Sequence, residues 1–415
     1  MKRVVVTGLG CVTPIGNTVD AFRDSLYAGR TGIAPFDPVF PGMVSPDPGL
    51  KFTQTAKVKD FDPAQHLTSG VIGSTDLGAQ LAIVAARQAA AQSGLAAAHD
   101  PTAIAIITGC ACGGRAVDEE GNRNLYVRNQ RVHPLAIVRN MASGGASYIA
   151  IDLGLRGATL NIATACASAT HAIGLAFQMV RAGIVPAAIT GGYEACLTFG
   201  FLRAWDSMRV VSPTACRPFA AGRDGMTLGE GAAMLAIEPL DAALARGARI
   251  YAELVGFGMS ADAHHITQPK AEGAALAMTR ALEDAANAGV EDARSRVGYI
   301  NAHGTGTQTN DAVEAAAIHL ALGDHASHTP VGATKSLTGH SIGATGALEA
   351  LATVLALDAA SLPHTAGVTE VDPTLNLDVL IGEPRPLDPA KDLALSNSLA
   401  FGGLNAVLAL RRYTA

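Results

Sequence analysis

The strongest constraint on the fold is that one order of segments occurs twice along the chain. Short β-branched runs alternate with alanine-rich stretches of helical pattern, for example residues 4–6 and 79–93, which is typical of an α/β protein. The strand followed by glycines at residues 4–10 recurs at residues 250–258. We therefore predict an α/β chain of two similar halves, residues 1–250 and 251–415.

Reactive side chains occupy the same place in both copies. Cys166 ends the apolar residues 160–165 and precedes a small-residue helix pattern, and His340 lies in a similar arrangement within residues 337–347. An internal duplication would bring the two helix starts together across a pseudo-twofold axis. The repeat therefore predicts that Cys166 and His340 share one site.

Cys166 has the context of a nucleophile. The unpaired N–H groups and the dipole of a first helical turn favour an anion, so we expect the pKa of Cys166 to fall toward the reactive thiolate. The alternative is a buried structural cysteine, the commoner fate of a free thiol. The other motifs of the chain have to decide between them.

The composition is that of a compact enzyme-like body. Hydrophobic residues make up 49% of the chain, charged residues only 16%, and there are 45 glycines, which suits closely packed helices and sheets. The formal net charge of −6 argues against general nucleic-acid binding, because phosphate neutralisation needs clustered Lys and Arg. The scattered Arg and Asn of residues 117–139, and the Pro, Asp and Phe of residues 35–62, predict two irregular surface segments.

The ends and the cysteines indicate an intracellular setting. Residues 1–8 run directly into a strand-like segment, and no later stretch is an uninterrupted apolar span of membrane length, so we expect a soluble, cytoplasmic protein. The six cysteines include no C-x-x-C pair, so we expect reduced thiols and no catalytic metal.

Three glycine-rich turns follow further predicted strands and concentrate unusual residues. The first, residues 301–307, carries His303 at a strand end, where α/β folds tend to place ligands. The second, residues 333–340, carries Lys335 and ends at His340. The third, residues 396–405, carries Phe401 before two glycines.

Together with Cys166, these turns resemble the elongating β-ketoacyl-acyl-carrier-protein synthases of the thiolase superfamily. The resemblance spans nearly the whole chain and has four ordered motifs: the turn at Cys166, the His-Gly-Thr-Gly-Thr loop at His303, the segment from Lys335 to His340, and Phe401-Gly402-Gly403 with Asn405. It implies a thiolase-like, duplicated fold with α/β/α/β/α layers.

The resemblance also implies a decarboxylative Claisen condensation on substrates carried by acyl carrier protein. Cys166 would accept the acyl chain, since a thiolate depends least on a strong base. His303 and His340 would donate hydrogen bonds to the enolate left by decarboxylation of a malonyl thioester. The backbone N–H groups of Cys166 and Phe401 would form the oxyanion hole, and Phe401 would gate the acyl pocket.

Supporting roles follow from the same resemblance. Lys335 would be an orienting charge paired with Glu314 or Glu349. Thr305 and Thr307 would bind the amides of phosphopantetheine, the carrier's prosthetic arm, and no bound cofactor is expected. Cys112 would stand at the floor of the acyl pocket. Four residues match positions that hold a structural monovalent cation in some relatives: Asn301, Glu349, Ser396 and Asn397.

Two departures from the family concern the substrate and its carrier. Ala400 replaces a hinge glycine before Phe401, and we expect the lost φ freedom to stiffen or redirect the gate. Residues 67–76 contain no basic residue, although relatives place a basic helix there for the acidic carrier. Other candidates for a basic patch are Arg123, Arg128, Arg131, Arg203 and Arg209.

Several alternatives remain open. The pathway is fatty-acid synthesis or a specialised polyene- or polyketide-type assembly, and the protein is a homodimer or a heterodimer with a related subunit. A non-catalytic, chain-length-factor-like partner would lack the nucleophile, and a thiolase would need a second reactive cysteine, but none follows Cys216. A papain-like protease and a Rossmann dinucleotide site lack their local signatures.

Overall fold

A large mixed sheet runs through the computed structural model, which describes residues 1–36 and 49–414. Eleven strands form this sheet. In spatial order they are β12 (Asp378–Val379), β10 (Pro330–Gly332), β9 (Val297–Asn301), β14 (Leu393–Ala400), β15 (Leu404–Arg412), β8 (Ala252–Ala261), β1 (Val4–Val12), β7 (Gly231–Pro239), β6 (Ala188–Glu194), β4 (Ala105–Gly109) and β5 (Thr159–Ile162).

The two halves of this sheet have the same topology. The order β1-β7-β6-β4-β5 in the N-terminal half matches β8-β15-β14-β9-β10 in the C-terminal half. In each half the first two pairings are antiparallel and the last two are parallel. The halves join where β1 pairs with β8 over three residues, so the predicted duplication is a property of the fold.

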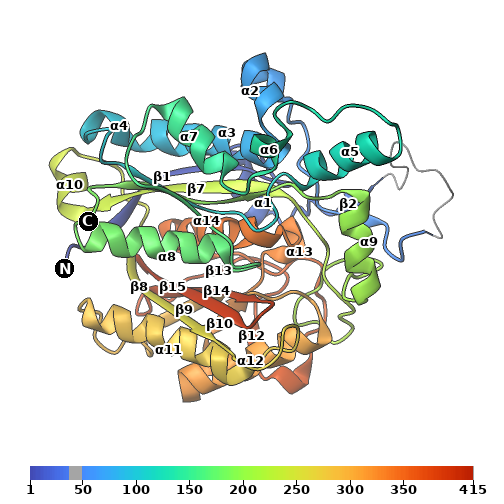
Figure 1. Cartoon of the computed structure of the whole chain (residues 1–415). Coiled ribbons are helices and arrows are strands. Elements are labelled where there is room, and N and C mark those ends of the chain that lie inside the picture. The colour runs from blue at the N-terminus through green and yellow to red at the C-terminus, as the bar shows by residue number, and fades with distance from the viewer. Residues whose placement is uncertain (37–48, 415) are drawn as a thin grey trace.

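Helices complete a five-layered arrangement (Figure 1). Helix α3 covers the N-terminal half of the sheet, α11 covers the C-terminal half, and α8 and α14 lie between them and contact strands of both. The helices are α1 (Val19–Tyr27), α2 (Ser69–Ser74), α3 (Leu77–Ser93), α4 (Leu95–Ala98), α5 (Arg115–Tyr126), α6 (Ala136–Asn140), α7 (Gly144–Leu153), α8 (Ser168–Arg181), α9 (Phe199–Met208), α10 (Leu240–Ala245), α11 (Ala271–Asn287), α12 (Gln308–Leu322), α13 (Lys335–Thr338) and α14 (Thr345–Ala359). The layered α/β/α/β/α architecture agrees with the sequence-based expectation.

Paired glycines explain why the strand-then-glycine pattern occurs twice. A Cβ atom on Gly10 would lie 2.0 Å from the carbonyl oxygen of Ala85 in α3, and one on Gly258 would lie 2.0 Å from that of Ala277 in α11. Only glycine allows a helix backbone to approach a strand this closely. Gly10 and Gly258, the glycines of the repeated pattern, are therefore the positions at which the two outer helices pack against the strands.

Two sequence-based expectations need correction. Residues 117–139 are not wholly irregular, because α5 and α6 cover much of them; ion pairs of Arg123 with Glu119 and Glu120 at helical spacing support α5. Residues 342–359 are long and apolar enough to cross a membrane, but 89% of this stretch is buried in the protein, as expected for a core helix. Of the predicted irregular excursion at residues 35–62, residues 37–48 lie outside the described part.

Candidate active site

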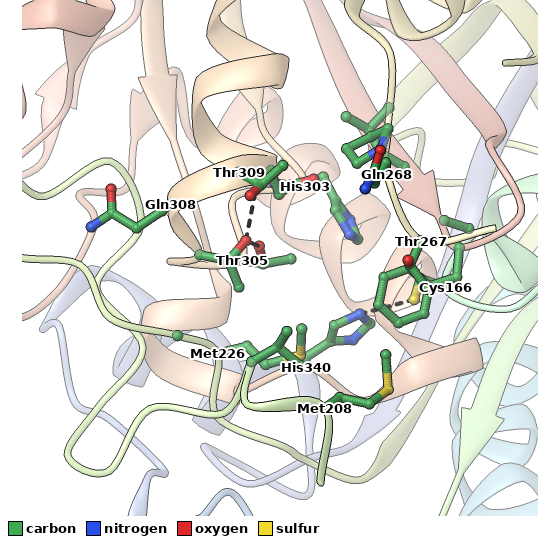
Figure 2. A pocket seen from close by; sticks show the side chains of 18 of the residues that line it. Cys166, Met208, Met226, Thr267, Gln268, His303, Thr305, Gln308, Thr309 and His340 are labelled. Atoms are coloured by element: carbon green, nitrogen blue, oxygen red, sulfur yellow. Dashed lines mark hydrogen bonds between the residues drawn. The ribbon is translucent and has the colours of Figure 1, made fainter. Parts of the chain in front are cut away.

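A cavity of about 370 Å³ brings the separate sequence motifs together (Figure 2). Residues from both halves line it, among them Cys166, His303, His340, Thr305, Thr307 and Phe401. The Sγ atom of Cys166 and one ring nitrogen from each histidine lie within 4.8 Å of one another. Three segments far apart in the sequence therefore converge on one thiol.

The turn before α8 presents Cys166 to this cavity. Strand β5 ends at Ile162 and α8 begins at Ser168, so the cysteine lies just before the first helical turn. The preceding residue, Ala165, has a left-handed φ of 49°, a conformation that costs a non-glycine residue about 1–3 kcal/mol. The Ser168 hydroxyl supports this turn by accepting from the Thr164 N–H at 2.9 Å and donating to the Ala165 carbonyl at 2.7 Å.

The expected lowering of the Cys166 pKa is wrong for this closed site. Cys166 is only 6% exposed, and burial raises its pKa to about 12. The Lys335 charge and the backbone N–H groups of Phe401 and Cys166 act in the lowering direction, but they do not outweigh the loss of water. The thiol is therefore protonated in the free protein near neutral pH.

His340 is held in a single tautomer beside this thiol. Its Nδ1 accepts a hydrogen bond from the Ile342 N–H at 3.1 Å, and the Thr345 hydroxyl lies 2.9 Å from the same nitrogen. Burial holds the pKa of His340 well below its ordinary value, so the ring is neutral and its proton is on Nε2. That Nε2 lies 3.1 Å from the Sγ of Cys166 and faces it as a donor.

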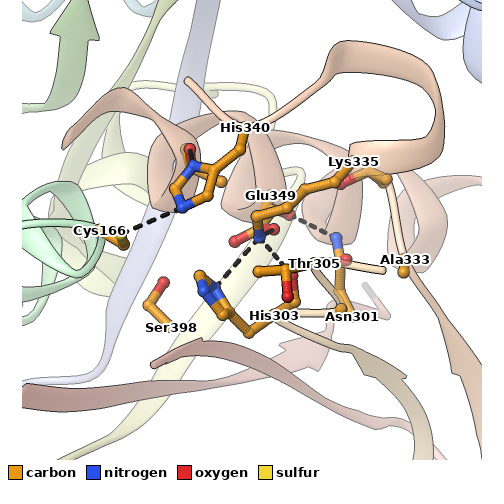
Figure 3. Close-up of polar contacts among 12 residues, drawn as sticks. Cys166, Asn301, His303, Thr305, Ala333, Lys335, His340, Glu349 and Ser398 are labelled. Carbon is orange, nitrogen blue, oxygen red and sulfur yellow. Dashed lines mark hydrogen bonds and ion pairs between the residues drawn. The ribbon is translucent and has the colours of Figure 1, made fainter. Parts of the chain in front are cut away.

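The His303 ring has the same polarity, imposed by a different neighbour (Figure 3). The Lys335 Nζ lies 3.1 Å from its Nδ1 and also donates to the His303 carbonyl oxygen and to Glu349. Burial is the largest cause of its lowered pKa, followed by the Lys335 charge. A neutral ring that accepts at Nδ1 carries its proton on Nε2.

The two glutamates expected near Lys335 have separate tasks. Glu349 pairs with the ammonium of Lys335. Glu314 instead accepts from the backbone N–H groups of His303 at 2.7 Å and Gly304 at 2.8 Å, and from the side chain of Asn397. Lys335 and Glu349 therefore orient the ring of His303, while Glu314 fixes its loop.

The other predicted site residues fall into two places. The hydroxyl oxygens of Thr305 and Thr307 lie 2.9 Å apart in the cavity wall. Cys112 is absent from the lining of this cavity and belongs to a neighbouring apolar cluster with Phe52, Leu202 and other side chains. The described pocket is thus the approach to Cys166, and the apolar cluster lies to one side of it.

Four buried oxygen atoms lack any hydrogen-bond partner at the expected cation positions. They are Oδ1 of Asn301, Oε2 of Glu349, Oγ of Ser396 and Oδ1 of Asn397. Asn301 and Ser396 face each other in the pairing of β9 with β14, and the Asn301 side chain donates to the Glu349 carbonyl oxygen. Buried oxygens of this kind without a partner are costly, and oxygen atoms are the ligands that a hard cation prefers.

Sequence reasoning missed several residues of the cavity. Trp205 and Met208 of α9, and His265, Thr267 and Gln268 after β8, all line it, and Figure 2 shows Met208, Thr267 and Gln268 around the opening. The dense polar run at residues 262–269 was a signal that could have found the second group. Nothing in the sequence places α9 beside the site.

The chain is similar to known β-ketoacyl synthases over nearly its whole length. A family model described as "Beta-ketoacyl synthase, N-terminal domain" matches residues 1–243, and "Beta-ketoacyl synthase, C-terminal domain" matches residues 251–369. The chain is 41% identical to "3-oxoacyl-[acyl-carrier-protein] synthase 2" of Synechocystis sp., over 99% of this chain and 98% of that protein.

Two solved structures are similar over their full length. One, described as "The ishigamide ketosynthase/chain length factor", has a TM-score of 0.91 and 33% identity and covers 100% of both chains. The other, a type II polyketide synthase acyl carrier protein in complex with its ketosynthase bound to the hexaketide, has a TM-score of 0.87 and 28% identity, covering 99% of this chain and 100% of that one. With its duplicated sheet and its converging Cys166, His303 and His340, the chain belongs to the β-ketoacyl synthase family.

Proposed function

We propose that this β-ketoacyl synthase elongates a Cys166-bound acyl chain by decarboxylative Claisen condensation with malonyl-acyl carrier protein. The observation that carries the assignment of roles is the polarity of the two imidazoles. His303 and His340 are both neutral, both have Nδ1 occupied, and both carry their proton on Nε2, close to the Cys166 sulfur. Two such rings can donate hydrogen bonds to a developing oxyanion, but they cannot accept a proton at Nε2.

The first step loads the acyl chain. The Cys166 sulfur attacks the thioester carbonyl of the carrier-bound acyl group, the carrier's C–S bond breaks, and the proton of Cys166 ends on the departing carrier thiol. Because burial raises the pKa of Cys166 to about 12, its proton must leave as the thioester arrives. The positive end of α8 and the Lys335 charge favour the sulfur's transient negative charge.

The second step generates the carbon nucleophile. Malonyl thioester enters the same cavity, its C–C bond to the carboxylate breaks, and carbon dioxide leaves. The electron pair remains as an enolate whose oxygen accepts from the Nε2–H groups of His303 and His340. Donors fixed in a water-poor site stabilise such charge strongly, by about 2.7–4 kcal/mol for one donor.

The third step forms the new carbon–carbon bond. The enolate carbon attacks the acyl carbonyl on Cys166, and the backbone N–H groups of Cys166 and Phe401 stabilise the tetrahedral oxyanion. Both N–H groups already face the sulfur, since each lowers the pKa of Cys166. Collapse breaks the bond between the acyl carbon and the Cys166 sulfur, releases the β-ketoacyl carrier, and leaves a Cys166 thiolate that takes up a proton from solvent. None of these steps calls for a bound cofactor.

We propose that acyl carrier protein, with its phosphopantetheine arm in the cavity, delivers both substrates. Thr305 and Thr307 then face the amides of the arm. Among the five candidate arginines, Arg123, Arg128 and Arg203 make ion pairs with nearby acidic side chains, whereas Arg209 lines the cavity and is exposed. Arg209 is therefore our candidate for a contact with the acidic carrier.

A second subunit fits the exposed face around α5, α6 and β5. This face carries exposed apolar side chains on and beside these elements, with Tyr126 and Ile137 both 79% exposed and Leu160 on β5 47% exposed. Strand β5 is also an edge of the large sheet, and unpaired edges favour association. We propose that a second copy or a related subunit covers this face, as a homodimer or heterodimer in the cytoplasm.

The four unpartnered oxygens fit a structural monovalent cation. Asn301, Glu349, Ser396 and Asn397 would hold it, and the cation would add no bond-making step. We expect the thermal midpoint to fall by several degrees, equivalent to about 1–3 kcal/mol, when sodium and potassium are replaced by choline. Ser396→Ala should reduce this dependence, and equal midpoints of wild type in all three salts would contradict the cage.

A silent partner subunit and a thiolase are both less well supported. A silent subunit would have no use for a thiol flanked by two oriented imidazoles. A thiolase would need a second cysteine at this centre, and in the described residues the cavity lining includes Cys166 as its sole cysteine.

The decisive experiment supplies purified protein with acyl- and malonyl-carrier protein. We expect carbon dioxide, a longer β-ketoacyl thioester, and an acyl adduct on the Cys166 peptide by mass spectrometry. The length and unsaturation of the adduct formed from the native carriers distinguish fatty-acid synthesis from a specialised pathway. Absence of both adduct and carbon dioxide would overturn the proposal.

A further inference from the structure

The only tryptophan of the chain lies against the residue expected to gate the acyl pocket. The Trp205 and Phe401 rings are stacked, with centroids 5.7 Å apart and an interplanar angle of 18°. Phe201, one helical turn earlier in α9, contacts Trp205 edge-on at 6.0 Å. Aromatic pairs at these separations attract each other beyond simple burial of their surface.

Phe401 is tied to the chemistry through its backbone and to α9 through its ring. Its N–H lowers the pKa of Cys166, so the main chain lies at the sulfur. Trp205, Phe401 and Cys166 all line the same cavity. Motion of the Phe401 ring therefore breaks the stack with Trp205 at the entrance to the thiol.

Hydrogen bonds hold the backbone that follows Phe401 in place. Gly402 and Gly403 have φ values of 85° and 69°, which non-glycine residues rarely adopt. Their main chains are held to the segment after β8, because the Gly402 N–H donates to the Ile266 carbonyl at 2.7 Å and the Gly403 carbonyl accepts from Asp262 at 2.9 Å. Because the backbone after Phe401 is held, the position of the Phe401 ring depends on the side chains that it packs against.

Helix α9 also connects the gate to the apolar cluster that contains Cys112. Leu202 is a buried member of this cluster, and Phe201 and Trp205 pack against it as partly buried residues. The same cluster includes Ile342, close to His340 in the chain. An acyl chain that enters it from Cys166 presses on the helix that carries Trp205.

We propose that Trp205 is a latch for Phe401, a positioning residue that keeps the gate closed until an acyl chain long enough to reach the α9 cluster displaces the stack. The inference rests on the condensing function proposed above. Opening the gate then costs the Trp205–Phe401 contact, and filling of the cluster offsets that cost. Short acyl groups, which stop at Cys166, leave the latch closed.

Tryptophan fluorescence of the unmodified protein gives a direct test, because Trp205 is the one tryptophan in the sequence. We expect acylation of Cys166 by an octanoyl- or longer acyl-carrier protein to change the Trp205 emission, and acetylation to leave it unchanged. Mass spectrometry of the same samples verifies that both groups are on Cys166. Full acylation by both donors with the same emission would overturn the latch.

Variants then test the position of the ring. Trp205→Ala should raise the rate of Cys166 acylation by long chains about 3- to 10-fold, since the loss of one aromatic pair amounts to that factor, and should change the rate of acetylation by a smaller factor. It should also speed hydrolysis of the acyl-enzyme, because the gate no longer excludes water. Trp205→Phe should restore wild-type behaviour, and Phe201→Leu, which keeps the Trp205–Phe401 stack, is the matched control.

The outcomes separate the latch from the function on which it rests. If wild type is never acylated at Cys166, the condensing function fails. If wild type is acylated but Trp205→Ala changes long- and short-chain rates by one common factor, Trp205 is merely structural and the latch is wrong. A chain-length-dependent change that Trp205→Phe reverses supports it.

Discussion

The loop after β4 and the loop after β9 are the same backbone device in the two halves, with different side chains. In each, a buried carboxylate accepts from the second and third residues after the strand. Glu194 accepts from Ala111 at 2.9 Å and Cys112 at 3.2 Å, and Glu314 accepts from His303 at 2.7 Å and Gly304 at 2.8 Å.

The two loops show that equivalent positions in the two halves of a duplicated fold have different roles. Where the C-terminal half has His303, the equivalent position of the N-terminal half has Ala111, beside an apolar cluster suited to an acyl chain. The N-terminal half supplies the thiol, and the C-terminal half supplies both imidazoles and Lys335. The loop held by a buried carboxylate therefore positions one residue in each half, and the identity of that residue determines the chemistry.

The largest effect should come from replacing one catalytic residue in each half, Cys166 in the N-terminal half and His340 in the C-terminal half. Cys166→Ala should lower condensation at least ~1000-fold, because no acyl group can be held, yet still release carbon dioxide from malonyl-carrier protein. His340→Ala should still be acylated at Cys166 but lose about 100- to 1000-fold in decarboxylation. Carbon dioxide release and the mass of the Cys166 peptide measure the two activities. A Cys166→Ala protein that condensed normally would refute the division.

Replacing Glu314 and Glu194, the carboxylates that hold the two loops, by glutamine compares the loops directly. Glu314→Gln leaves a backbone N–H facing an amide, so His303 should shift and decarboxylation should fall by about 10- to 100-fold. Glu194→Gln should mainly lower the free energy of unfolding, by about 1–3 kcal/mol, with a smaller loss of decarboxylation. Urea unfolding and carbon dioxide release provide the measurements. Equal losses of decarboxylation in both variants would mean that the loops do not differ in role.

The paired glycines test whether the two halves pack alike. Gly10→Ala and Gly258→Ala should each lower the free energy of unfolding by about 1–3 kcal/mol or more, because each Cβ meets a helix carbonyl oxygen at 2.0 Å. Gly222→Ala is the control, since nothing lies within 4 Å of its Cβ position. Denaturant unfolding checks all three proteins, and a harmless Gly258→Ala would break the equivalence.

The smallest effect concerns pH. Burial keeps the pKa values of His303 and His340 below 6.5 in the folded protein, so the folded rings stay neutral where the unfolded chain takes up protons. Their contribution to stability is therefore lost as pH falls below about 6.5, by about 1.4 kcal/mol per pH unit for each ring. Protonation of the two imidazoles should therefore not lower decarboxylation between about pH 8 and 6.

A matched variant isolates this contribution. Glu194 and Glu349 have pKa values raised by burial to about 7 and about 8, so their contribution is lost as pH rises and opposes the histidines. Both glutamates are retained in His340→Gln, so the difference from wild type reports the imidazole. The free energy of unfolding of the variant should fall less steeply below pH 6.5; identical slopes would count against a neutral His340.

Sequence reasoning reached the site because its residues lie at strand and helix ends that repeat. The glycine and apolar pattern marked the turns at Cys166, His303 and His340, and the repeat predicted that the first and third meet. The family resemblance then assigned their roles. The helix at residues 115–126 was missed because its support comes from charged pairs and it buries no side chain. Trp205 was missed because no local pattern reports what a surface helix faces.

By itself, the sequence determined the α/β class, the duplication and the chemical types at the centre, since periodicity and residue identity are local properties. Only the tertiary structure decided the protonation states. Burial reverses the effect expected of a helix end on Cys166, and contacts from Lys335 and Ile342 assign the protons of the two imidazoles. Desolvation and hydrogen bonding depend on atoms far away in the chain, so no local pattern contains them.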